Sequence, residues 1–151
     1  MVKQLFFATG LVIAVFPVIL FALAFLSRSG SAPGLVDGRL TRCSPKPNGV
    51  CSEFPDDSAH FVEPLPFISR QELREVIKRG GGTVVKELDS YVASTFSSSF
   101  FGFVDDCEFR LDYENNVIHV RSVSRVGYSD LGVNRKRVDK LRSLSAEYAG
   151  K

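Results

Sequence analysis

The sequence predicts an α+β domain behind an N-terminal transmembrane helix, with a roughly four-stranded antiparallel sheet packed by two helices. Three observations predict this class: an uncharged run near the N-terminus, consecutive strand patterns, and an amphipathic helix pattern on either side of the strands. The length of 151 residues fits one modest domain. We divide the chain into an anchor (1–27), a linker (28–41) and a soluble domain (42–151).

The N-terminal segment has the pattern of a membrane anchor. The run Leu5–Leu26 contains no charged side chain, and about 20 apolar residues are enough for a helix to cross the hydrocarbon core of a bilayer. Pro17 is compatible with such a helix. The run exceeds the roughly 7–15 apolar residues of a secretory signal peptide. We therefore expect an uncleaved signal anchor, with membrane lipid as its partner.

The location of the domain depends on two opposing signals. Positive charges that follow the run, beginning at Arg28, favour a cytoplasmic domain. Cys43 and Cys51 lie eight residues apart in a Pro/Gly/Asn-rich segment, a spacing that allows a disulfide in an oxidising compartment; two unpaired thiols are the alternative. We expect a single-pass membrane protein with an extracytoplasmic domain, in a periplasm or an organelle lumen. Cys107 is expected to be a buried small hydrophobic residue.

Two irregular segments come next along the chain. Residues 28–40 are rich in Ser, Gly and Pro, which is typical of a linker. The segment Arg42–Phe67 contains five prolines, which forbid a long helix and disfavour a central strand. We expect this segment to wrap over the domain in an extended, irregular conformation.

The regular elements begin at a helix start signal. Ser69 and Glu72 form a capping-box pattern, and an apolar stripe at helical spacing follows until the glycines at 80–82, so we predict a helix over Arg70–Arg79. Four strand patterns come after it, and the last two form a hairpin across Asn115-Asn116. A final helix is expected after Ser129 or Asp130. The predicted strands are Thr83–Leu88, Tyr91–Phe96, Phe103–Asp112 and Val117–Ser124, and the final helix buries Val138, Leu141, Leu144 and Tyr148.

Charge and motif content exclude several functional classes. The net charge of +2 gives no strong attraction to nucleic acid. The basic run 135–137 lies among acids and has only Tyr128 as a neighbouring aromatic residue, so we expect no nucleic-acid partner. That run forms either a solvated helix face or a face toward anionic lipid headgroups. No common nucleotide-binding or zinc-protease motif is present, and we expect no cofactor.

The densest charge cluster lies between Arg121 and Arg142, with seven basic and two acidic residues. Arg121 and Arg125 share one face of a strand, and with the backbone donors near Ser129 they form a candidate site for a carboxylate or phosphate. The alternative is that these arginines pair internally with Asp105, Asp106 and Glu108. Strand parity places Asp105 on the core face, where a carboxylate requires a partner.

An enzymatic alternative uses the same acids. Asp105 and Asp106 with His60 form the candidate set of a metal-dependent hydrolase, although catalysis is the less favoured interpretation. His60 also lies near Glu63, Asp56 and Asp57, which is a loose metal-ligand spacing.

The chain resembles the domain of unknown function family 1499 over about Cys43–Leu144. The matching segments are Cys43–Ser52, His60 with Pro64, Phe103–Asp106 and Arg121–Arg135. The resemblance implies a small domain behind a membrane anchor or signal, an accessory part of membrane or organellar assemblies, without an established activity or cofactor. We therefore predict a non-catalytic module that recognises an anionic group or a protein partner. Its predicted binding residues are Arg121, Arg125, Ser129, Asp105, Asp106, Asn134 and Arg135.

Overall fold

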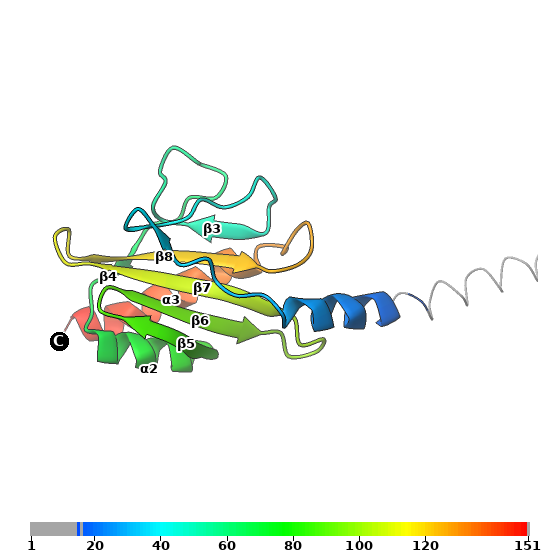
Figure 1. Ribbon diagram of the computed structural model, residues 1–151. Coiled ribbons are helices and arrows are strands. Elements are labelled where there is room, and N and C mark those ends of the chain that lie inside the picture. The colour runs from blue at the N-terminus through cyan, green and yellow to red at the C-terminus, as the bar shows by residue number, and fades with distance from the viewer. Residues whose placement is uncertain (1–14, 16, 151) are drawn as a thin grey trace, which may run out of the picture.

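An antiparallel sheet carries two helices on one of its faces in the computed structural model, which describes residue 15 and residues 17–150 (Figure 1). The strand order is β3-β8-β7-β6-β5, and β4 also pairs with β8. The six strands are β3 (Gly49–Cys51), β4 (Leu65–Pro66), β5 (Gly82–Leu88), β6 (Tyr91–Ser97), β7 (Val104–Asp112) and β8 (Val117–Ser124). The α+β class is confirmed, but the expected four-stranded sheet is wrong because six strands are present.

The two additional strands come from the proline-rich segment. β3 lies in the proline-free stretch between Pro47 and Pro55 and pairs with residues 121–123 of β8. β4 consists of two residues and pairs with the start of β8, ending at Pro66. Prolines remove backbone donors, so they limit both strands to a few residues instead of preventing them. β8 is consequently an interior strand.

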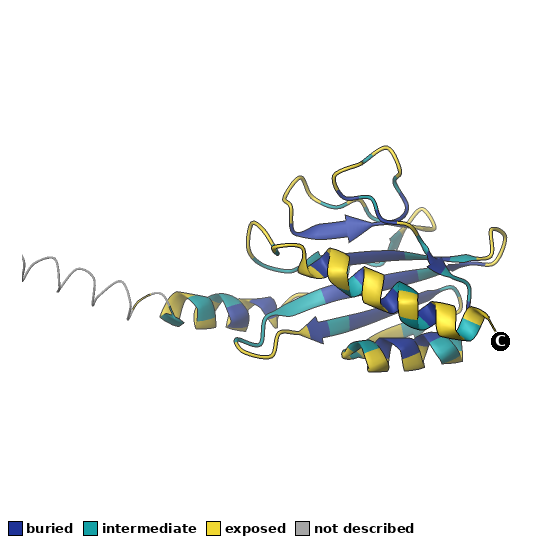
Figure 2. Cartoon of the chain, turned by 180° about the vertical axis from the view of Figure 1, so that it is seen from behind, coloured by how far each residue is buried: buried dark blue, intermediate teal, exposed yellow. Residues whose placement is uncertain are grey.

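Two helices cover the sheet, and the first of them begins and ends at the predicted signals. α2 spans Arg70–Gly80, and Ser69 and Glu72 form the expected capping box. The helix ends at Gly81, whose φ of 98° lies in the left-handed region that glycine adopts without strain. α3 spans Val133–Ala149 and packs beside α2 (Figure 2).

The apolar core lies between these helices and the sheet. Phe109, Ile118 and Val120 project from the central strands and are fully buried against Leu73 and Leu141 of the helices. Cys107 is also fully buried there, as predicted. Successive residues of a strand point to opposite faces, so Glu108 and Arg110 lie on the face that no helix covers.

The N-terminal part of the chain covers that second face. Residues 28–42 run along it and include a small hairpin of β1 (Leu35–Val36) and β2 (Arg39–Leu40). Leu40 is buried together with Tyr91 and Ala93 of β6. The region expected to be a linker therefore packs against the sheet over part of its length.

A helix over residues 17–27 precedes this segment and projects from one end of the sheet (Figure 1). Within residue 15 and residues 17–150, no helix is long and apolar enough to cross a membrane. The spanning helix expected at Leu5–Leu26 is therefore not found there, and much of that run lies outside the described residues.

Candidate functional site

The second face of the sheet carries a row of ion pairs between β7 and β8. Glu108 and Arg121 stand directly opposite each other in the register and bond at 2.7 Å between Oε2 and Nη1. Arg125 bonds Asp106, with 2.7 Å between Nη2 and Oδ1. Because cross-strand neighbours of opposite charge stabilise a sheet, this row supports the central hairpin.

The Glu108 carboxylate is fully buried and has three donors. It accepts hydrogen bonds from Arg121, from the Tyr91 hydroxyl at 2.7 Å and from the Gly34 backbone N–H at 2.9 Å. Burial and the neighbouring carboxylate raise the pKa of Tyr91, so the hydroxyl remains a donor. The Nε of Arg121 is buried and meets no acceptor within the described part of the chain.

Glu53, two residues after β3, extends the row and connects it to Arg39 of the covering segment. Its side chain is 1% exposed and bonds Arg110 at 2.6 Å and Arg39 at 3.0 Å. Burial opposes ionisation of Glu53, but the hydrogen bonds from both arginines outweigh it and lower its pKa. The covering segment is thus bonded to the sheet through charge as well as apolar contact.

Asp105 lies on the opposite, helix-covered face, as strand parity predicts. Its partner is Arg137 of α3, at 2.6 Å between Oδ2 and Nη2. Arg137 also donates to Asn134 and to Ser122, and Ser122 donates to Asn134 at 2.6 Å. Asn134 therefore has a structural role in the first turn of α3. Arg137 was not among the predicted site residues, although it follows Asn134 at the i+3 spacing that places two side chains on one helix face.

The predicted anion site at Arg121, Arg125 and Ser129 is not assembled. The two arginines bond separate carboxylates, and Asp130 already accepts the N–H groups of Gly132 and Asn134 at the start of α3. Burial opposes ionisation of Asp130, but these N–H groups outweigh it and lower its pKa. The helix N-cap is Gly132, so neither Ser129 nor Asp130 occupies the predicted cap position.

The three residues of the hydrolase interpretation lie in separate environments. Asp105 and Asp106 point to opposite faces of β7, and each bonds its own arginine. His60 bonds Asp57 at 2.9 Å through Nδ1 and the Lys46 carbonyl at 3.1 Å through Nε2. No group of three or more metal-ligating side chains occurs in residues 17–150. Asp56 pairs with Arg42 instead.

The cysteines near this face are free thiols. Cys43 packs against the small cluster that contains Cys51, so the two residues share one environment. Burial raises the pKa of Cys43 to about 12 and that of Cys51 to about 11. The Cys43–Cys51 disulfide stays a prediction.

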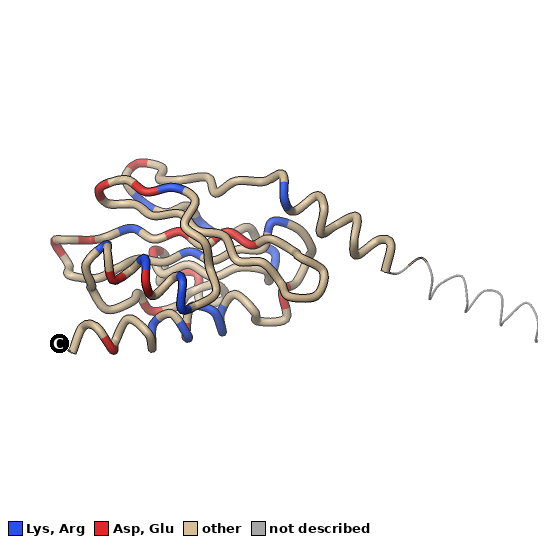
Figure 3. The backbone as a smooth tube through the Cα atoms, turned by 90° about the horizontal axis from the view of Figure 1, so that it is seen from below, with Lys and Arg blue, Asp and Glu red and all other residues tan. Residues whose placement is uncertain are grey.

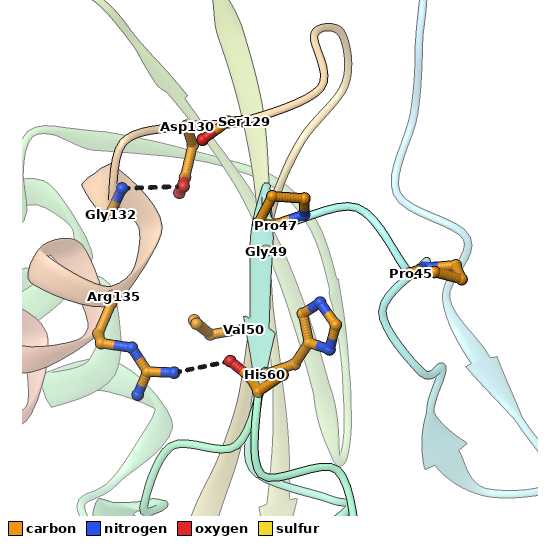
Figure 4. A pocket seen from close by; sticks show the side chains of 10 residues that line it. Pro45, Pro47, Gly49, Val50, His60, Ser129, Asp130, Gly132 and Arg135 are labelled. Atoms are coloured by element: carbon orange, nitrogen blue, oxygen red, sulfur yellow. Dashed lines mark hydrogen bonds between the residues drawn. The ribbon is translucent and has the colours of Figure 1, made fainter.

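A pocket of about 300 Å³ lies between the β3 segment and the start of α3 (Figure 4). Pro45, Pro47 and Val50 form its apolar wall, and Ser129, Asp130 and Arg135 supply polar groups. The Arg135 guanidinium donates to the carbonyls of Phe61 and Ala59, at 2.8 and 3.2 Å, and it forms no ion pair within residues 17–150. Its positive charge is consequently available at the pocket rim.

Parts of three of the four segments on which the sequence resemblance depends line this pocket. Pro45 to Val50, His60, and Ser129 to Arg135 are far apart in sequence, and they meet at this one place. Ser129 and Arg135 belong to the predicted binding residues. Their proximity to the proline-rich segment depends on the pairing of β3 with β8, which the sequence pattern did not predict.

Comparison with known proteins gives a family without an established activity. No curated protein and no solved structure matches the chain. One family model matches residues 39–144, from β2 to the later turns of α3. The matched range contains the charged row, the Asp105 network and the pocket. The chain belongs to the family described as Protein of unknown function (DUF1499).

Proposed function

We propose that this protein is a membrane-anchored, non-catalytic binding module that recognises a carboxylate on a protein partner. The observation that carries the proposal is the pocket of Figure 4, where Arg135 presents a positive charge beside a proline-lined wall. A guanidinium bonds carboxylates in a planar, two-point geometry. Rigid proline rings add apolar contact at a low cost in conformational entropy.

The absence of catalysis is inferred from how the acids are used. Asp105 bonds Arg137 and Asp106 bonds Arg125, both with short distances and largely buried side chains. Each carboxylate is thus engaged with its own arginine, and the two point to opposite faces of β7, so they cannot act together on one substrate. The charged residues thus support a structural role on both faces of β7, with ligand binding left to the pocket.

The membrane anchor is inferred from the N-terminal run and the helix that continues from it. Residues 5–26 carry no charge, and Val18, Phe25 and Leu26 are each at least 60% exposed on the helix over residues 17–27. Apolar side chains exposed along a helix require an apolar environment. We place the domain on the extracytoplasmic side, where the Cys43–Cys51 disulfide would persist.

Photo-crosslinking in the native membrane tests the binding role. A photoreactive amino acid replaces Ala59, which lines the pocket, in the full chain, and the adducts are compared with and without Arg135→Gln. The expected result is a specific protein adduct that Arg135→Gln abolishes. The matched control is Lys136→Gln, which removes the neighbouring exposed cation and should leave the adduct unchanged. An adduct that forms equally with and without Arg135→Gln would contradict the proposal. Hydrolytic turnover that Asp105→Asn removes would contradict it as well.

A further inference from the structure

The end of the molecule that carries the helix over residues 17–27 is unusually apolar. Two loops lie at this end: the β6–β7 loop, over residues 98–103, and the β8–α3 loop, over residues 125–132 (Figure 1). They contain Phe100, Tyr128 and Leu131, which are 83%, 73% and 87% exposed and are the three most exposed large hydrophobic side chains in the described part. Such side chains, gathered in one place, indicate a contact surface.

Both loops run alongside the helix instead of stopping at its end. The Phe101 ring contacts the Phe21 ring edge-on, with 5.5 Å between centroids. On the other loop, Val126 lines a cavity of about 320 Å³ together with Leu20 and Leu23 of the helix. Phe21 lies six residues before Ser27, which corresponds to about 9 Å along a helix. The loops therefore reach about 9 Å past the end of the helix toward its N-terminus.

Hydrogen bonds fix this arrangement at the helix end. The Ser27 hydroxyl accepts the Val104 backbone N–H at 2.9 Å, and Arg125 donates to the Ser27 carbonyl at 3.0 Å. Helix and sheet are thus joined at a defined level. If residues up to Leu26 enter a bilayer, the loops that lie beside Leu20, Phe21 and Leu23 must enter its surface layer as well.

We propose that the β6–β7 and β8–α3 loops form a membrane-seating surface that inserts into the headgroup region of the lipid bilayer. The inference rests on the membrane anchoring in the proposed function and adds a second contact with the membrane. A depth of about 9 Å matches the 5–10 Å to which apolar side chains of surface-bound helices enter the interface. Aromatic residues favour this layer, and the β6–β7 loop carries no charge (Figure 3). Arg28, exposed at the helix end, lies where it can contact anionic headgroups.

Site-specific tryptophan fluorescence tests the surface, because the chain contains no tryptophan. Four full-chain variants, Phe100→Trp, Tyr128→Trp, Val18→Trp and Tyr113→Trp, are reconstituted into vesicles of phosphatidylcholine and phosphatidylglycerol with or without brominated acyl chains. Tyr113 is the matched control: it is 63% exposed in the β7–β8 turn at the opposite end of the sheet. Val18 reports the helix itself.

The expected result is a blue-shifted emission and a loss of fluorescence with brominated lipid for Phe100→Trp and Tyr128→Trp, and neither effect for Tyr113→Trp. Quenching of Val18→Trp alone would overturn the seating surface while leaving the anchor intact, and would assign the loops to another partner. If neither Val18→Trp nor the loop variants are quenched, both the anchor and the seating surface fail. Loop quenching without Val18 quenching would contradict the anchor and, with it, the geometry from which the seating surface is inferred.

Discussion

Arg125 bonds both carboxylate oxygens of Asp106, at 2.9 Å from Nε and 2.7 Å from Nη2, and its third nitrogen donates to the Ser27 carbonyl at 3.0 Å. One side chain, from the residue that follows β8, therefore holds β7 and the end of the helix over residues 17–27. A cation at the last carbonyls of a helix also opposes the negative end of the helix dipole. The residue that the sequence predicts to bind a ligand thus links the helix over residues 17–27 to the rest of the domain.

Removing this link should loosen the segment after the helix. Arg125→Ala deletes the bonds to Ser27 and Asp106, so the exposed Arg28 should become a faster trypsin site as local opening becomes more frequent. The measurement is the rate of cleavage after Arg28 in detergent solution. Lys136→Ala removes a cation from an exposed helix position and should leave the rate unchanged. Equal rates for both variants would show that Arg125 does not hold the helix.

Glu108 should be one of the most sensitive positions for stability. Glu108→Gln leaves the Arg121 guanidinium buried without a counter-charge, and breaking a buried pair in this way typically costs about 3–5 kcal/mol. Chemical denaturation of the full chain measures the free energy of unfolding. The control is Glu114→Gln, an exposed position in the β7–β8 turn, where a change within about 0.5 kcal/mol is expected. A similar small change for Glu108→Gln would refute the role of the pair.

Asp112 should make the folded state sensitive to acid. The side-chain and backbone hydrogen bonds from Asn115, with Arg110 nearby, lower the pKa of Asp112 to about 2. The stabilisation is complete above the ordinary carboxyl pKa of about 4 and is lost as the pH falls toward the folded value. Asp112→Asn should lower stability at neutral pH and flatten its decline between about pH 4 and pH 2. An unchanged acid profile in this variant would contradict the assignment.

The mass of the alkylated protein tests the predicted Cys43–Cys51 disulfide. Cys43 and Cys51 share one packed cluster, and we predict that they form a disulfide in an oxidising compartment. In protein isolated from such a compartment and alkylated under denaturing, non-reducing conditions, only Cys107 should then react. Alkylation of all three thiols would remove this support for the extracytoplasmic location. The raised pKa values of Cys43 and Cys51 predict that any unpaired thiols there also react slowly in the folded protein.

Local patterns predicted much of the fold. The capping box at Ser69, the glycine at the end of α2 and the alternation along β7 are decided by neighbours in sequence, and the structure confirms each of them. The strands of the proline-rich segment could not be predicted in this way. β3 and β4 are two or three residues long, and they are stabilised by pairing with β8 instead of by their own pattern.

In the candidate site, too, local patterns predicted some features, and contacts between distant segments decided the others. Strand parity predicted that Asp105 faces the core and requires a partner, but that partner, Arg137, comes from a helix 32 residues later. The pairing of Glu108 with Arg121 follows from the hairpin register, and the saturation of Arg125 by Asp106 and Ser27 depends on a helix 98 residues earlier. Which charges remain free for a ligand is therefore a property of the tertiary structure.

The central claim is that the arginine–carboxylate pairs are structural, and a double-mutant cycle on Arg125 and Asp106 tests it most directly. We predict that Arg125→Met and Asp106→Asn each lower the free energy of unfolding by about 3–5 kcal/mol in the full chain. The double variant should lose less than the sum, with a coupling of about 1–3 kcal/mol. Single variants close to wild type in stability, with effects that add within about 0.5 kcal/mol, would show that Arg125 is free for a ligand and contradict the account.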